Sequence, residues 1–515
     1  MGLGFTHPFI YFRARFNAGL TMVVALFPFF IFFVSFFIYL FSAFPSIYWR
    51  DASEFQAIGF LLDIAHPAGS PLYTIIAKLF TLIPLGSVAF KVILVSCFFG
   101  ALISVLLYQV ILLVFGLLSK VLPDRSRLTF EPIIALFCAL VFSFSNALWE
   151  NSNVPEVYTL QNFFTIFFML ILLKLEGERL YLLEGGQGRI MRLLMTFLFL
   201  LGLSLGAHAI LVLYVPLLVL WIYFSYFRPT AFNTLKVISL SLFFFLLAFS
   251  VYLHLPIRSA QNPYYDWGNP ETFQNLMTHA SDRKDAAHHF SVQKSVLPSQ
   301  MSMYLGFYPD NFSYLGIVFS FIGFFYLLFK KKVRLLLIFT LFFFPPFLFF
   351  IRYWGETSAF IPNFLVFCIL MSVGFFVSSI QIEELIRHKH IRPAYVSILL
   401  ILIAFQFVFL FSNHLKENKG SDYWMPRDVT RNMINDLPPN AIIISSLTWF
   451  MLSYLQQAEG YRPDVSILSL TSFIAPDFFS KLEASKFPNI VIPDESLEEL
   501  GSVFLSGGIS WWSDT

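Results

Sequence analysis

Long apolar runs without charged side chains are the feature that most limits how this chain can fold. The first of them, residues 18–44, contains no Asp, Glu, Lys or Arg. A helix of about 20 apolar residues is long enough to cross a bilayer. Only 12% of the residues are charged, which is about half the share that is usual in soluble proteins. The sequence therefore predicts an all-α membrane protein with many passes.

The number of apolar runs of spanning length predicts about eleven transmembrane helices. They lie at residues 18–44, 87–118, 129–147, 158–174, 193–205, 207–227, 237–256, 313–329, 335–351, 359–380 and 394–412. Gly202, Gly206 and His208 suggest a tight turn inside the stretch 193–227. Residues 70–84 are apolar but too few to span, so we expect an interfacial or re-entrant helix there.

The distribution of Lys and Arg predicts the orientation of these helices. With the N-terminus on the cytoplasmic side, every basic cluster, including residues 330–334, falls in a cytoplasmic loop. The loop 148–157 and the turn near Gly206 carry no Lys or Arg. This orientation places the loops 45–86, 148–157 and 257–312 on the non-cytoplasmic side, together with everything after residue 412.

Residues 413–515 have a different character from the membrane region 1–412, and we expect them to form a small α/β domain. A strand at 441–446, a helix at 448–459 and a second strand at 465–470 form a βαβ-like fragment. It has no glycine-rich phosphate loop, so no nucleotide is expected. The three cysteines lie in apolar runs, which indicates neither disulfides nor a metal site. A net charge of +2 gives no indication of nucleic-acid binding.

The stretch YWRDASEFQAIGFLLDIAHPAGSPLY, residues 48–73, places several charges just outside the first span. Asp51 and Glu54 are three residues apart, so on a helix their carboxylates share one face. The prolines after His66 must end that helix. A carboxylate pair in this place is typical of a catalytic site at a membrane surface. The alternative is a solvated interfacial helix whose acids have no chemical role.

Further polar residues are expected on the same side of the membrane. Each has a structural alternative, because Trp and Tyr favour membrane interfaces, Arg258 could extend to the interface, and Glu156 could cap the next helix. Their combined pattern predicts a site for a ligand with an anionic head and a lipid tail. The candidates are Glu156, Tyr158, His208, Arg258, Asn262 and Trp267.

Several motifs together resemble one family of polytopic membrane proteins. They are WRDASEF, HPAGSPLY, NVPEVYTLQNFF, GLSLGAHAI, LPIRSAQNPYYDWGNPETF and LPPNAIIISSLTWFMLSYLQQAEGYRPDVSIL, and they cover residues 45–470. The family was formerly known only as a domain of unknown function. Its animal members are protein O-mannosyltransferases that act on IPT/TIG domains, and it is placed among the GT-C glycosyltransferases. The animal members continue into helical repeats that residues 1–515 do not contain, so their acceptor specificity is not carried over.

The resemblance implies a GT-C fold, a polyprenyl-phosphate sugar donor and mannose as the sugar. In such enzymes a carboxylate of the first outer loop acts as general base, which implies Asp51, with Glu54 as the alternative base or as a sugar ligand. Arg258 is expected to bind the donor phosphate. His66, Glu156, Tyr158, His208, Asn262 and Trp267 are expected to contact the sugar or the acceptor. Neither a metal nor another cofactor is expected.

The predicted function is therefore transfer of a sugar from a polyprenyl phosphate to a hydroxyl group, that of protein Ser or Thr being the acceptor expected. The setting would be a bacterial inner membrane or the endoplasmic reticulum membrane. One alternative is a transferase that modifies a lipid or a glycan. Another is a transporter or flippase of lipid-linked substrates, although such proteins place polar groups near the bilayer midplane. A third is a membrane scaffold for the tail domain.

Overall fold

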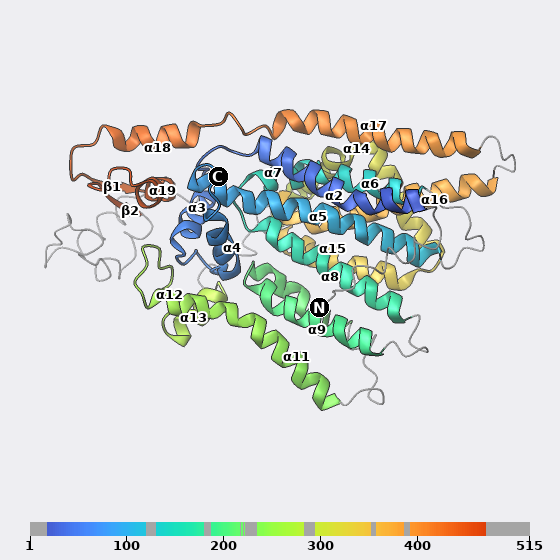
Figure 1. Ribbon diagram of the computed structural model, residues 1–515, viewed down its shortest axis with the longest axis horizontal. Helices are drawn as coiled ribbons and strands as arrows, with labels where there is room; N and C mark the ends of the chain where they lie inside the picture. The colour runs from blue at the N-terminus through green and yellow to red at the C-terminus, as the bar shows by residue number, and fades with distance from the viewer. Residues whose placement is uncertain are drawn as a thin grey trace.

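The computed structural model forms an elongated helical bundle (Figure 1). It describes residues 18–119, 130–179, 187–216, 218–219, 221, 234–282, 294–351, 357–385, 392–446 and 448–469. Within these ranges, eight helices are long and apolar enough to cross a membrane, or nine if one bent pair counts as a single span. The all-α polytopic architecture expected from the sequence is therefore confirmed, although the described residues contain eight or nine such helices where the sequence predicts about eleven.

The long helices run along the bundle (Figure 1). They are α2 (Ala18–Ser42), α5 (Val88–Ser119), α6 (Glu131–Ser143), α8 (Tyr158–Arg179), α9 (Gln187–Leu205), α11 (Thr234–Phe249), α14 (Leu297–Phe329), α15 (Val333–Phe350), α16 (Ile361–Leu385) and α17 (Arg392–Glu417). The 32 residues of α5 correspond to about 48 Å of helix. This exceeds the hydrocarbon thickness of about 30 Å, so α5 extends beyond the apolar layer.

The core lies where α5 and α16 are surrounded by the other helices. Phe115 of α5 stacks on Phe376 of α16 with ring centroids 4.4 Å apart. α14 and α16 approach each other very closely at two glycines. A Cβ on Gly323 would lie 2.0 Å from the Leu370 carbonyl oxygen, and one on Gly374 would lie 1.9 Å from that of Phe319. Small residues allow this kind of backbone approach in membrane helices.

The shorter elements gather at one end of the bundle, at the left in Figure 1. They are α3 (Asp51–Leu61), α4 (Pro71–Thr81), α12 (His254–Ser259), α13 (Phe273–Ala280), α18 (Met425–Asn435), β1 (Ile442–Ser445), α19 (Trp449–Glu459) and β2 (Ser466–Ser469). Segments from the predicted loops 45–86 and 257–312 therefore meet the tail at this end. α4 is the short helix expected within residues 70–84.

The span predicted at 129–147 corresponds to a bent pair of helices, because the chain turns by 58° between α6 and α7 (Asn146–Asn153). Ser145 takes an extended conformation and its Oγ accepts a hydrogen bond from the Leu148 N–H. A serine in this position begins a new helix by capping it. After the bend, α7 packs against α2, α5 and α8.

Two other predicted boundaries also differ from the structure. The helix expected at 313–329 begins earlier, at Leu297, and is broken at Ser313, whose φ is 56°. The predicted pair 193–205 and 207–227 is separated by a turn at Gly206, as expected. After it comes a 3-10 helix, Ala209–Tyr214, and most of residues 217–233 lie outside the described ranges.

The tail forms the βαβ fragment predicted from its sequence. β1 and β2 pair in parallel, with Ile443 beside Ile467, and α19 connects them. The Ala89 N–H at the start of α5 donates to the Tyr454 hydroxyl of α19 over 2.8 Å. α19 also packs against α3, so this part of the tail contacts the helix that carries Asp51.

Candidate functional site

Asp51 and Glu54 lie on the same helix but in opposite environments. Asp51 is the first residue of α3 and is exposed, whereas Glu54 is fully buried one turn later. The difference arises because α3 packs against α4, α5 and α19, so that all its residues from Ala52 to Gly59 are buried. The carboxylate pair predicted from the spacing is thus one accessible group and one inaccessible group.

Glu54 holds His66 with both carboxylate oxygens. Its Oε1 accepts from the His66 backbone N–H over 2.9 Å, and its Oε2 lies 2.7 Å from His66 Nδ1. Burial lowers the pKa of His66, but the charge and hydrogen bond of Glu54 outweigh this effect and raise the pKa to about 10. The imidazole is therefore positively charged at neutral pH, and Glu54 orients it.

Further predicted residues lie near His66, namely Asp51, Glu156, Tyr158 and His208. The charges of Asp51 and Glu156 also act on the His66 ring. Glu156 is fixed through its backbone, because its N–H and carbonyl oxygen each lie 3.4 Å from the Ser96 hydroxyl. The Tyr158 ring lies 6.0 Å from that of His208.

His208 lies in the turn between α9 and the following 3-10 helix, and its charge state differs from that of His66. Its Nδ1 accepts a hydrogen bond from the Ile210 N–H over 3.1 Å, so the ring hydrogen is on Nε2. Burial, with the positive charge of His66, lowers its pKa to about 4. At neutral pH the candidate site therefore contains one positively charged histidine, His66, and one neutral histidine, His208.

Arg258 is tied to the loop after α3. Its Nη2 donates to Oδ1 of the buried Asp63 over 2.8 Å and to the Leu61 carbonyl over 3.3 Å. Its Nη1 donates to Gln261 Oε1 over 2.7 Å. The other oxygen of Asp63 accepts from the Tyr265 N–H over 3.1 Å. Asp63 therefore joins the loop after α3 both to α12 and to the segment that follows α12.

Asn262 and Trp267 lie on that same segment. Asn262 is an exposed turn residue with φ 50°, and its N–H donates to the Ser259 carbonyl. Trp267 packs its ring against Trp449 and Phe450 of α19. The structure places Trp267 in a contact with the tail.

His279 is a central residue that the sequence did not single out. It is 2% exposed and fits between two glycines with positive φ. A Cβ on Gly69 would lie 2.9 Å from its Nε2, and a Cβ on Gly268 would lie 2.8 Å from its Nδ1. This contact explains the glycines of HPAGSPLY and NPYYDWGNP, because only glycine leaves room for the ring. The glycines of these two motifs were the sequence feature that could have indicated a buried side chain such as His279.

The resulting arrangement has a defined chemical capacity. Asp51 is an exposed carboxylate that can accept a proton from a hydroxyl group. His66, held by Glu54, adds a positive charge within the same group of residues. Glu54 is hydrogen-bonded to His66 and Asp63 to Arg258, whereas Asp51 is exposed and accessible to a ligand. The candidate site lies at the end of an apolar bundle, where a lipid-linked substrate can present its head group.

The pairing of Glu54 with His66 predicts a pH-dependent stability. The pKa of His66 is raised from 6.5, so the stabilisation is complete below about pH 6.5 and is lost as the pH rises through about 10. We expect wild-type protein to exceed Glu54→Gln in Tm most at about pH 6, with the difference shrinking toward pH 10. Thermal unfolding across this range measures it, with Asp422→Asn, at an 81% exposed carboxylate, as the control. A difference that does not change with pH contradicts the pairing.

Comparison with known proteins gives one family and one fold. Residues 51–231 match the model of the protein O-mannosyl-transferase TMEM260 N-terminal domain. The chain is 26% identical over 498 residues to the TMEM260 protein O-mannosyl-transferase of Mus musculus, covering 90% of this chain and 65% of the relative. It is 24% identical over 511 residues to that of Dictyostelium discoideum, covering 88% and 58%. The chain thus spans about three fifths of these relatives.

Among solved structures, the fold is similar to that of ArnT from Cupriavidus metallidurans bound to undecaprenyl phosphate. The TM-score is 0.52 at 11% identity, covering 89% of this chain and 91% of ArnT. The likeness therefore concerns the fold and extends over nearly the whole of both chains, which confirms the expected GT-C-like architecture. The resemblance inferred from the motifs is also confirmed, since residues 51–231 match the N-terminal domain of the TMEM260 family.

Proposed function

We propose that this protein is a membrane glycosyltransferase that moves mannose from a polyprenyl phosphate to a hydroxyl group of protein Ser or Thr. The observation that carries the proposal is the exposed Asp51, beside the charged Glu54–His66 pair at the end of an apolar bundle. Two findings support it: the relatives are named protein O-mannosyl-transferases, and the similar ArnT structure contains undecaprenyl phosphate.

The proposed reaction needs one base and no acid. Asp51 takes the proton of the acceptor hydroxyl as its oxygen forms a bond to the anomeric carbon. The bond between that carbon and the phosphate oxygen breaks, and the polyprenyl phosphate leaves as a stable anion. A glycosidase needs a second carboxyl group, because its leaving alcohol must be protonated. Asp51 is accessible and Glu54 is bonded to His66, so the site offers one carboxylate as a base, as the transferase reaction requires.

The other residues are proposed to bind or position the substrates. Arg258 contacts the donor phosphate through Nη1, whose partner Gln261 is exposed and can be replaced by a phosphate oxygen. Glu54 positions His66. His66, Glu156, Tyr158 and His208 line the sugar and acceptor side, while Asn262 and Trp267 lie on the segment that follows Arg258.

Purified protein incubated with polyprenyl phosphate carrying labelled mannose tests this function. The acceptors are a folded protein domain rich in Ser and Thr, a lipid and a free glycan. We expect the label on the protein, at Ser or Thr. Label on the lipid or glycan alone would identify a transferase of a different acceptor class. Movement of intact donor across vesicle membranes without transfer would indicate a transporter and contradict the proposal.

We further propose that the end of the bundle carrying α3, α12, α13 and the tail is non-cytoplasmic, with the N-terminus cytoplasmic. The Lys and Arg distribution supports this orientation. Single cysteines at the exposed Ser281 and Lys419 are expected to react with an impermeant thiol reagent in intact cells, and one at Lys330 is not. The native cysteines are buried, so background labelling is low. Labelling at Lys330 alone would reverse the topology.

A further inference from the structure

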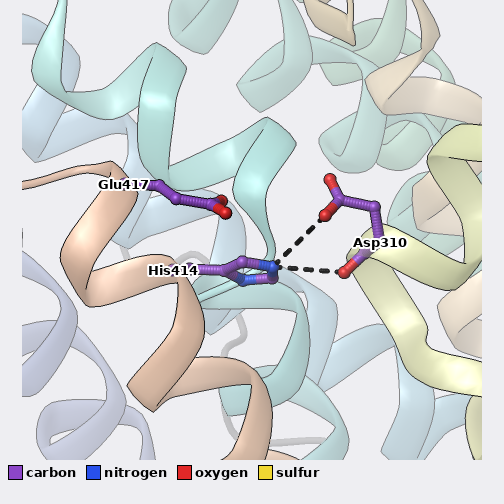
Figure 2. A group of neighbouring side chains, drawn as sticks. All are labelled: Asp310, His414 and Glu417. Carbon is purple, nitrogen blue, oxygen red and sulfur yellow. Dashed lines mark hydrogen bonds and ion pairs between the residues drawn. The ribbon is translucent and has the colours of Figure 1, made fainter.

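A second cluster of ligating side chains lies where the outer parts of α14 and α17 meet. Asp310 belongs to α14, while His414 and Glu417 are three residues apart on α17 and share a face. One ligand atom from each of the three lies within 4.8 Å of the others. Figure 2 shows the two carboxylates approaching the His414 ring from different sides.

The backbone of α14 is opened at this point. Ser313 has non-helical dihedral angles, and Pro309 lies within the helix, so carbonyl oxygens before the break lose their helical partners. α17 supplies replacements: Gln406 Nε2 donates to the Phe312 carbonyl over 2.6 Å, and His414 Nε2 lies 3.1 Å from the Asp310 carbonyl oxygen. The Asp310 carbonyl is therefore available as an additional ligand.

The hydrogen bonds of His414 define which nitrogen faces the cluster. Its Nδ1 lies 2.7 Å from the Phe144 carbonyl oxygen, and because a carbonyl only accepts, Nδ1 carries a hydrogen. This is the arrangement by which a ligating histidine is usually oriented. Nε2 faces the Asp310 carbonyl at 3.1 Å and Oδ1 at 3.9 Å (Figure 2). A lone pair directed at these oxygens is unfavourable unless a positive species lies between them.

We propose that Asp310, His414 and Glu417 bind a divalent transition-metal ion of the Zn²⁺ type. A proton on Nε2 would hydrogen-bond only to Asp310 and would meet Glu417 only through its charge, whereas a metal ion would bond to both carboxylates. One imidazole with two carboxylates suits Zn²⁺ or Mn²⁺, and Zn²⁺ binds such a set more tightly. Asn146 Nδ2 lies 3.4 Å from Asp310 Oδ2 and orients that carboxylate.

The ion would join two parts of the chain. α17 leads directly into the tail, and Asn418, the residue after Glu417, donates to Asn146 Oδ1 over 2.9 Å. A metal bond to Asp310 would therefore fix the exit of the tail against α14 and α7. The proposed site contains none of the residues assigned to sugar transfer, so its role is structural.

Zinc binding by the full-length purified protein tests the proposal. After the protein is stripped with a chelator, reloaded with Zn²⁺ and dialysed free of unbound metal, we expect about one Zn²⁺ per chain by elemental analysis. The Tm should be higher with zinc than without it, because a ligand that binds only the folded state stabilises it. Asp310→Asn and Glu417→Gln should each weaken zinc binding by about tenfold or more, the effect known for altered metal surroundings. Asp422→Asn, at an exposed carboxylate paired with Lys419, is the control and should bind as wild type.

Changes at Asp310 and Glu417 are preferred to changes at His414, because a variant of His414 would also lose the hydrogen bond to the Phe144 carbonyl that helps the protein to fold. Three results would overturn the proposal. They are that wild-type protein retains no zinc, that Asp310→Asn and Glu417→Gln both retain as much zinc as wild type, or that the protein binds Ca²⁺ but not Zn²⁺. The last result would mean that the imidazole is not a ligand, since Ca²⁺ prefers oxygen ligands.

Discussion

Replacing Asp51 by Asn is expected to lower the rate of sugar transfer about 10²–10⁴-fold, the usual contribution of a general base. The change keeps the size of the side chain and removes only its ability to take a proton. Stability should change little, because Asp51 is exposed and its carboxylate at a helix start contributes about 0.3–1 kcal/mol. Steady-state rates with labelled donor and unfolding curves of the same preparations measure both effects.

Glu54→Gln is the matched comparison, because it removes a carboxylate from the same helix. Glu54 is buried and bonded to His66, so this variant should lose stability, and its rate per folded molecule should fall less than that of Asp51→Asn. If Glu54→Gln abolishes transfer in folded protein while Asp51→Asn leaves it intact, their roles are exchanged. Wild-type rates in both variants would show that α3 is not catalytic.

Arg258→Lys is expected to raise the KM for the donor about 10- to 100-fold, which corresponds to the 1.5–3 kcal/mol of a hydrogen bond to a charged group. Lysine keeps the charge but cannot bind Asp63 and a phosphate at once through a planar fork. Donor titrations at saturating acceptor measure the KM, and kcat should change less.

Asp63→Asn distinguishes the proposed role of Arg258 in donor binding from its role in anchoring the loop after α3. It weakens the pair with Arg258, whose Nη2 lies 2.8 Å from Asp63 Oδ1, yet retains the guanidinium. We expect Asp63→Asn to lower Tm, because weakening a buried ion pair is destabilising, with a smaller effect on donor KM than Arg258→Lys. Equal losses of Tm in the two variants, with unchanged donor KM, would mean that Arg258 only anchors the loop.

Apolar runs made the membrane helices predictable, because the length and composition of a run depend on neighbouring residues. The bend at Ser145 and the break at Ser313 were not predictable in this way. At the break the replacement partner comes from a distant part of the chain, since Gln406 donates to the Phe312 carbonyl. The strands and helix of the tail were predictable because Gly460 clearly marks the end of the helix before the second strand.

The proximity of the candidate residues was easier to predict from the sequence than the contact that each one makes. Spacing placed Asp51 and Glu54 on one face, but only the packing of α3 distinguishes the exposed acid from the buried one. Arg258 pairs with Asp63 across 195 positions of sequence, a contact that no local pattern encodes. His279 was missed for the same reason, since its two glycines lie in separate motifs.

The most direct measurement follows labelled mannose supplied either on a polyprenyl phosphate or on a nucleotide diphosphate, with wild-type and Asp51→Asn protein. The account predicts that label reaches Ser or Thr of the acceptor only from the polyprenyl phosphate, and that Asp51→Asn loses this transfer while it still binds donor. Transfer from the nucleotide sugar alone, or an unchanged rate in Asp51→Asn, would contradict it.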